Sequence, residues 1–241
     1  MTNKKLGYKS EFYERYKDES YRSAKKIIPF VLELIKVKSV VDVGCGAGVW
    51  LKAFEEAGIK NILGIDGNST KVLDISASKF KIVDLESDFK IARRFDLAIS
   101  LEVAEHLYPE YADNFVLNLT KLAPIVLFSA AVPCQGGTRH VNEQWPDYWA
   151  EKFKKNGFLT FDVLRMKIWN DQEIGCWYRQ NTIIYVQKDF VKKILKISKL
   201  KPVEKPPRLF HPEGFRIKIL IHMIIKQLKR RMGFVQIDWL N

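Results

Sequence analysis

Carboxylate and imidazole side chains gather in two short segments of this sequence. Glu102, Glu105 and His106 are spaced i, i+3 and i+4, so a helical turn would place all three on one face. A fourth such side chain, His140, follows in a glycine-rich loop. Carboxylates and imidazoles bind divalent ions, so we expect Glu102, Glu105, His106 and His140 to form a metal site for Mg²⁺ or a similar ion.

The same side chains fit proton transfer. An imidazole whose pKa is near neutrality can take the proton of a hydroxyl group at physiological pH. His140 has Glu143 three residues behind it, and we expect the catalytic residues to be His140, Glu143 and His106. A purely structural role for His140 stays open as the alternative.

Polar and aromatic side chains alternate in the loop that holds His140. A sugar needs such a mixture, because its hydroxyl groups require hydrogen-bond partners and its C–H face stacks on rings. We expect Asn142, Gln144 and Trp145 to contact the substrate and Trp149 to lie in the core. The aromatic segment 169–179 is either a second substrate wall or only the edge of the last strand pair.

Short apolar runs separated by helical stretches predict the elements that carry these residues. We expect strands at 39–43, 61–66, 79–85, 95–101, 124–131, 158–164 and 182–186. We expect helices at 10–36, interrupted at Pro29, and at 51–57, 111–122 and 146–156. This alternation predicts an α/β fold with a doubly wound, seven-stranded, mostly parallel sheet, whose fourth and fifth strands open at the same edge.

A glycine turn follows the first expected strand, where residues 42–48 read Asp-Val-Gly-Cys-Gly-Ala-Gly. Glycines allow a ligand to approach bare main chain and tolerate the dihedral angles of the turn. The second strand ends at Asp66 and the third at Asp84, and an acid in such a place can accept both ribose hydroxyls of a nucleoside. The three acidic strand ends predict a nucleotide-type site.

These motifs, DVGCGAG, GID, VDL and FDLAISLEVAEHL, resemble the class I S-adenosylmethionine-dependent methyltransferases over about residues 38–187. The resemblance implies a Rossmann-like fold and S-adenosylmethionine as the cofactor. It also implies that Asp66 holds the ribose and that Asp84 and Leu85 meet the adenine. The full set of implied cofactor residues is Asp42, Gly44, Cys45, Gly46, Asp66, Asp84, Leu85, Ser100 and Glu102.

Two narrower resemblances bear on the acceptor. The E-x-x-E-H segment is similar to metal-assisted O-methyltransferases that act in ubiquinone synthesis or on the terminal ribose of small RNAs, although members that use no metal share it. The stretch 128–149 and the segment WYRQN resemble uncharacterised bacterial and viral methyltransferases associated with surface-polysaccharide genes.

These resemblances lead to three readings of the function. We expect an O-methyltransferase that acts on a hydroxyl of a sugar or glycan. The alternatives are a metal-assisted ribose 2′-O-methyltransferase that acts on RNA, and a non-catalytic S-adenosylmethionine-binding protein that associates with a membrane or a partner.

Positive charge is concentrated at the end of the chain. Of the 241 residues, 188–241 hold 14 basic and 4 acidic residues, whereas 1–187 hold 26 basic and 24 acidic ones. A nearly neutral body argues against an RNA groove, which is normally basic. The expected units are a helical segment at 1–37, the methyltransferase domain at 38–187 and a basic tail at 188–241.

The tail pattern predicts a basic amphipathic helix over 214–232, set apart by a proline-rich linker at 201–207. Such a helix suits an anionic membrane surface, and docking on the body is the alternative. The sequence has no apolar run long enough to span a bilayer, no secretory signal and no Cys-x-x-Cys pair. We therefore expect a cytoplasmic protein that is peripheral to the membrane, with its oligomeric state undetermined.

Overall fold

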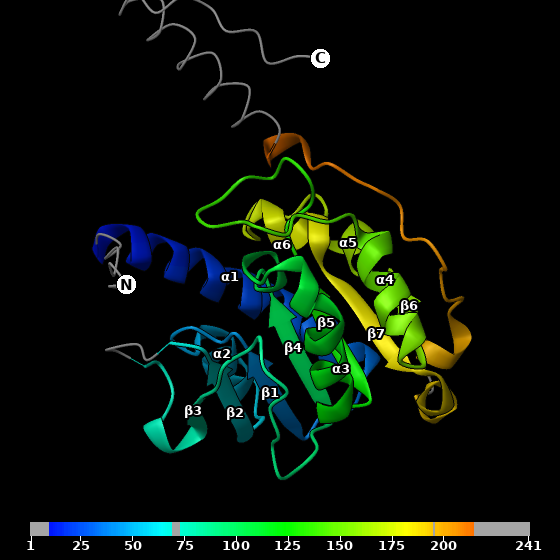
Figure 1. The fold of residues 1–241 in the computed structure, drawn as a ribbon, viewed down its shortest axis with the longest axis horizontal. Helices are drawn as coiled ribbons and strands as arrows, with labels where there is room; N and C mark the ends of the chain where they lie inside the picture. The colour runs from blue at the N-terminus through cyan, green and yellow to red at the C-terminus, as the bar shows by residue number, and fades with distance from the viewer. Residues whose placement is uncertain (1–9, 69–72, 195, 215–241) are drawn as a thin grey trace, which may run out of the picture.

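A computed structural model describes residues 10–68, 73–194 and 196–214 of the chain (Figure 1). Its centre is a seven-stranded sheet in the order β3-β2-β1-β4-β5-β7-β6. Strands β1 to β5 pair in parallel, and β7 is antiparallel to both of its neighbours. The predicted doubly wound, mostly parallel sheet is confirmed. The strands are β1 Ser39–Val43, β2 Asn61–Asp66, β3 Phe80–Ile82, β4 Leu97–Leu101, β5 Ile125–Ser129, β6 Phe158–Phe161 and β7 Ile183–Gln187.

Helices cover both faces of the sheet because the strands carry apolar side chains on both faces. Val40 packs with α1 and α2 on one face, and Val41 packs with α3 and α4 on the other. Both side chains are fully buried, as expected for a parallel strand covered on two sides. The helices are α1 Ser10–Leu34, α2 Val49–Glu56, α3 Ala112–Leu122, α4 Pro146–Lys155, α5 Arg165–Ile168 and α6 Cys176–Asn181.

Two local predictions are corrected, and the short helices after β6 were not predicted. Helix α1 runs through Pro29 without an interruption. Proline has no N–H group, so the carbonyl oxygen of Lys25 lacks its helical donor. Both residues lie on the exposed face of the helix. The third strand ends at Ile82, because Asp84 accepts the main-chain N–H of Glu86 and turns the chain. Helices α5 and α6 were not predicted, as they are only four and six residues long.

The proline-rich segment at 201–207 is not a free linker. The main-chain N–H of Val203 donates to the carbonyl oxygen of Thr160 in β6 over 2.9 Å, and Pro206 is buried. Arg208 then pairs with Asp147 at the start of α4. The chain therefore follows the body as far as residue 214.

Except for Gly214, the predicted amphipathic helix at 214–232 lies outside the described residues. None of the helices in the described part of the chain combines the length and the apolar character that crossing a bilayer requires.

Candidate active site

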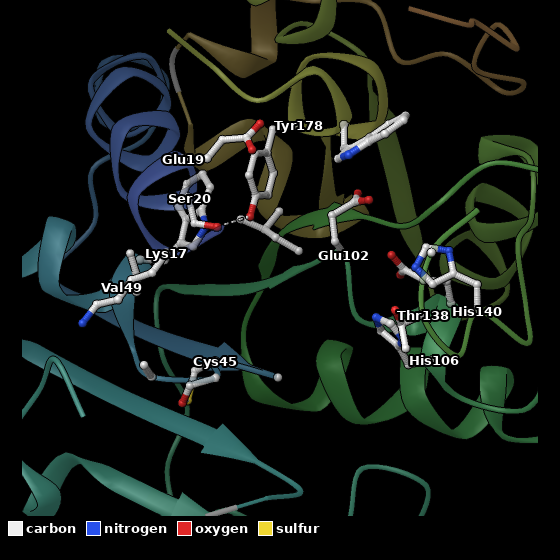
Figure 2. Close-up of a pocket in the computed structure, with 18 of the residues that line it drawn as sticks. Lys17, Glu19, Ser20, Cys45, Val49, Glu102, His106, Thr138, His140 and Tyr178 are labelled. Carbon is white, nitrogen blue, oxygen red and sulfur yellow. Dashed lines mark hydrogen bonds between the residues drawn. The ribbon is translucent and has the colours of Figure 1, made fainter. Parts of the chain in front are cut away.

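A cavity of about 570 Å³ opens at the carboxyl edge of β1, β4 and β5 (Figure 2). It is bounded by the glycine turn after β1, the loops after β4 and β5, and one side each of α1 and α6. The parallel strands meet at this edge, so loops far apart in the sequence share one space. Its lining residues include Asp42, Gly44, Cys45, Gly46, Glu102, Glu105, His106, His140, Lys17, Glu19, Ser20, Gln135, Trp177 and Tyr178.

The glycine turn leaves main chain exposed to the cavity at Gly46. Its φ is 53°, in the left-handed region, and a Cβ atom added there would meet nothing within 4 Å. At Gly44 (φ 83°) the same atom would collide with Val103, so that glycine serves close packing instead. Asp66 fixes the turn, because its carboxylate accepts the Gly46 N–H over 2.8 Å. The open backbone at Gly46 fits the approach of a ligand.

Asp42 is a buried acid that faces the cavity. Its side chain is 4% exposed, and burial, together with the nearby Asp66, raises the pKa of its carboxyl group well above the usual range. A cationic ligand would stabilise the ionised form of this carboxyl group, which burial disfavours. The site thus fits a cofactor that carries positive charge.

The nucleoside side of the predicted site is only partly assembled. Asp66 lies at the end of β2, but its carboxylate accepts the main-chain N–H groups of Gly46 and Asn68 and does not line the cavity. Asp84 is exposed in the turn after β3, and Leu85 is buried beside it. Their contacts with ribose and adenine remain predictions.

Two further predicted cofactor residues have different outcomes. Cys45 lines the cavity, and burial raises the pKa of its thiol. Ser100 does not line it: this fully buried hydroxyl donates to the carbonyl oxygen of Val43 over 2.9 Å and ties β4 to β1. The assignment of Ser100 to the cofactor is corrected, because its polar group is used inside the sheet.

Glu102 follows β4 in a strained conformation, with φ at 55°. Its carboxylate accepts hydrogen bonds from the amides of Gln135, over 2.7 Å, and Asn181, over 3.1 Å. Burial raises its pKa and these amides oppose the shift. The left-handed residue breaks the expected helical turn, so Glu102 does not share a face with Glu105 and His106. Its assignment as a metal ligand is corrected.

Three of the four expected metal ligands do come together. Ligand atoms of Glu105, His106 and His140 lie within 4.8 Å of one another. Glu105 is fully buried, and neither carboxyl oxygen has a hydrogen-bond partner among the described residues. An uncompensated buried carboxylate is the feature that a cation would relieve. Two imidazoles and one carboxylate favour Mn²⁺, Fe²⁺ or Zn²⁺ over Mg²⁺, which prefers oxygen ligands.

Burial raises the pKa of the Glu105 carboxyl group well above its usual range, and Glu102 adds to this shift. Nearby, the His106 and His140 rings meet edge to face, with centroids 4.9 Å apart. Burial lowers the pKa of His106, and His140 lowers it further. The His106 ring therefore lies where a neutral imidazole, able to accept a proton or a metal, is favoured.

The imidazole of His140 is oriented by a carboxylate. Its Nδ1 lies 3.1 Å from Oε1 of Glu143, which also accepts the main-chain N–H of Gly136. A carboxylate can only accept, so Nδ1 carries the proton and Nε2 is the basic nitrogen. A Cβ atom on Gly137 would lie 2.1 Å from Nε2, so only a glycine can pack this closely against the His140 ring. Glu143 does not line the cavity and acts through His140.

The expected substrate residues do not line the cavity. The main-chain N–H of Asn142 donates to the Glu105 carbonyl, and its side chain accepts from Gln144 over 3.1 Å. Trp145 packs edge to face against Phe210. Asn142, Gln144 and Trp145 thus brace the loop behind His140, and the prediction that they contact substrate is corrected for this cavity. Trp149 lies in the core, as predicted.

Sequence reasoning missed the wall that α1 contributes. Lys17, Glu19 and Ser20 line the cavity, and the Ser20 hydroxyl is 3.0 Å from the hydroxyl of Tyr178 (Figure 2). Nothing in the local pattern of α1 marks these residues. Trp177 and Tyr178 belong to the segment that was predicted as either a wall or an edge, and they form a wall.

A doubly wound sheet with the order 3-2-1-4-5-7-6, a glycine turn after its first strand and a cavity above that turn define the Rossmann-like methyltransferases as a class. Residues 13–178, more than half of the chain, match the methyltransferase domain family. The chain belongs to this family. The predicted class, the S-adenosylmethionine-dependent methyltransferases, is therefore confirmed, and with it the predicted cofactor and the assignment as an enzyme.

Solved structures agree on the fold. The sugar N-methyltransferase of a Streptoalloteichus species is similar with a TM-score of 0.57 and 11% identity, covering 78% of this chain and 96% of that one. The magnesium protoporphyrin IX methyltransferase of Synechocystis with bound S-adenosylmethionine has a TM-score of 0.53 and 16% identity, covering 75% and 86%. Such identities establish the architecture and leave the acceptor open. No curated protein matches the chain.

Proposed function

We propose that this methyltransferase transfers the methyl group of S-adenosylmethionine to a hydroxyl group of a sugar or glycan. One observation carries the proposal: His140, oriented by Glu143, lines the same cavity as the glycine turn at Gly46. A proton acceptor and a bare backbone for the cofactor thus face one space. The sugar N-methyltransferase among the similar structures shows that this architecture serves sugar acceptors elsewhere.

The residues at the glycine turn fit the cofactor by charge and shape. S-adenosylmethionine carries a sulfonium and an ammonium group, and the carboxyl groups of Asp42 and Glu102 both line the cavity. We assign Asp42 to the positive charge beside the turn and Glu102 to the ammonium group. When bound, the cofactor supplies an electrophilic methyl group.

His140 performs the proton transfer in this proposal. Its Nε2 takes the hydroxyl proton while the oxygen–carbon bond forms and the carbon–sulfur bond breaks. Glu143 holds the ring by Nδ1 and stabilises the imidazolium that results. Methyl transfer is a single displacement, so alignment of the hydroxyl oxygen with the methyl carbon provides most of the remaining acceleration.

The walls opposite the turn favour a polyhydroxylated acceptor. Trp177 and Tyr178 bring aromatic rings to the lining, and Glu19 and Ser20 bring polar side chains to the same space. Sugar rings bind by stacking their C–H faces and pairing their hydroxyl groups. The cavity is not lined mainly by cations, and Lys17, one of its cations, is paired with Asp74 over 2.8 Å. These features favour a neutral sugar over an RNA backbone.

A metal-assisted version of the reaction is a second candidate, supported by the unpartnered carboxylate of Glu105. Glu105, His106 and His140 would hold the ion. A divalent ion there would bind adjacent hydroxyl groups and lower the pKa of one of them. Since Nε2 of His140 cannot bind a metal and accept a proton at once, the two versions exclude each other.

The proposal is tested by transfer of a labelled methyl group to monosaccharides, glycan extracts and RNA, each with and without a chelator and over a range of salt. We expect label in a sugar or glycan, with turnover that is insensitive to salt. Label in RNA alone, with affinity falling steeply as ionic strength rises, would contradict the sugar acceptor. Turnover that a chelator abolishes and Mn²⁺ restores would select the metal-assisted version.

A further inference from the structure

Residues 207–214, named the strap here, form an integral part of the fold beside α6. The fully buried guanidinium of Arg165 donates to the carbonyl oxygen of Pro207 over 3.0 Å. Arg179, which is 2% exposed, forms an ion pair with Glu213. In Figure 1 the strap is the orange segment that ends above α6. The strap thus supplies the carboxylate partner of Arg179 and one carbonyl partner of Arg165, whose own carboxylate partner is Asp162.

Three side-chain amides connect the strap to the cavity. The main-chain N–H of His211 donates to the amide oxygen of Gln180 over 2.6 Å. The Gln180 nitrogen donates to the amide oxygens of Asn181, over 3.0 Å, and Gln135, over 3.3 Å. The nitrogens of Asn181 and Gln135 in turn donate to the two carboxylate oxygens of Glu102. A continuous relay therefore runs from His211 to Glu102.

The first donor orients Gln180, and Gln135 is oriented also by the main-chain N–H of Val132 and by the Asn181 amide nitrogen, which donates to its oxygen over 2.9 Å. A main-chain N–H can only donate, so the oxygen of Gln180 must face His211 and its nitrogen must face the other two amides. Those amides then present their oxygens to Gln180, which leaves their nitrogens for Glu102. If Gln180 were reversed, carbonyl oxygens would face a carboxylate and repel it. Gln135 has a second anchor, the main-chain N–H of Val132 at 3.3 Å.

We infer that Gln180 is a positioning residue, and that the strap holds Glu102 ready for the cofactor through the main-chain N–H of His211. The inference rests on the proposed function, which assigns Glu102 to the ammonium group of S-adenosylmethionine. The strained φ of Glu102 supports it, because a left-handed residue that is not glycine persists only where its surroundings fix it. The relay supplies that fixation on both carboxylate oxygens.

The test separates the N–H group of His211 from its side chain. His211→Pro removes the donor, His211→Ala keeps it but removes the buried ring that contacts Trp169 and the Glu213 N–H, and Gln180→Met breaks the relay at its centre. Two quantities are measured in the full-length protein: the affinity for S-adenosylhomocysteine by calorimetry, and the side-chain amide resonances of Asn181 and Gln135 by NMR without ligand.

We expect His211→Pro and Gln180→Met to bind S-adenosylhomocysteine about tenfold more weakly, the effect of losing a hydrogen bond to a charged group. Their Asn181 amide protons should move upfield, whereas His211→Ala, which keeps the main-chain donor, should change less than His211→Pro in both measurements. Folded Gln180→Met and His211→Pro proteins with wild-type affinity and unchanged amide resonances would overturn the inference. A wild type that binds no S-adenosylhomocysteine would instead refute the proposed function, and the resonances would still decide the role of the strap.

Discussion

Nδ1 of His140 and Oε1 of Glu143 lie 3.1 Å apart, in a pair whose side chains are 12% and 20% exposed. This contact fixes which ring nitrogen is basic, so it predicts graded effects on turnover. We expect His140→Gln to lower kcat by about 10²–10⁴-fold, the usual contribution of a general base. Glu143→Gln should lose less, because the ring keeps its place but loses stabilisation of its charged form.

Steady-state kinetics on the labelled-methyl assay measure both variants, and the KM for S-adenosylmethionine should stay near the wild-type value. Full turnover in His140→Gln would remove the general-base role.

Gly46 and Gly58 provide a matched pair for testing the cofactor site. Both have positive φ, 53° and 97°, and at both an added Cβ atom would meet nothing within 4 Å of the protein. The Ala variants should therefore lose similar stability, about 1 kcal/mol each. Only Gly46→Ala should lose S-adenosylhomocysteine affinity in calorimetry, because its methyl group projects into the cavity. Equal affinity in the two variants would show that the ligand does not approach this turn.

We expect the buried carboxyl group of Asp42 to lower the stability of the ligand-free protein. Because its folded-state pKa is raised, the wild type loses stability as pH rises above about 4, the ordinary Asp value. Asp42→Asn avoids this loss, so its thermal midpoint should exceed that of the wild type at pH 7. A difference of about 1 kcal/mol corresponds to about 2–4 °C.

The advantage of Asp42→Asn should vanish at about pH 4 and below, where the wild-type carboxyl group is protonated in both states. Melting curves from pH 4 to pH 8 check the sign. If Asp42→Asn were less stable than the wild type at every pH, the Asp42 carboxylate would have stabilising partners that the structure does not show.

The cluster around Glu105 predicts that metal ions change the thermal stability of the protein, which can be measured without an activity assay. If the unpartnered carboxylate and the two imidazoles bind Mn²⁺, the ion should raise the thermal midpoint of the wild type by mass action. Glu105→Gln should melt higher than the wild type without metal, since at neutral pH the wild type must keep this buried carboxyl group protonated or bury its charge, and the variant should not respond to Mn²⁺. Equal responses of the two proteins to Mn²⁺ would exclude this site.

The sequence predicted the sheet well because its strands are apolar on both sides and are separated by unambiguous glycine turns. Val40 to Val43 and the glycines behind them leave few alternatives. Glu102 was misjudged because a left-handed φ at a non-glycine residue leaves no mark in the sequence. Asn142 and Gln144 were misjudged for a different reason: polar side chains beside aromatic ones can brace a loop as well as bind a sugar.

The wall formed by α1 was beyond prediction for a third reason. The apolar pattern of a helix shows which of its sides is buried, but not which strand ends its polar side will reach. Ser20 and Tyr178 are 158 positions apart in the chain, and only the tertiary fold brings their hydroxyl groups together.

The burial of Arg165 and Arg179 sets a lower limit on the size of an autonomous fragment of this enzyme. A shortened protein that stopped at Gln187, where the last strand ends, would strip Arg179 of its carboxylate and Arg165 of one of its carbonyl partners. The shortened protein would also lose the cover that residues 207–214 give these two side chains, so both arginines would sit in an incomplete environment. Shortened versions intended for biochemical work should therefore extend at least through Gly214.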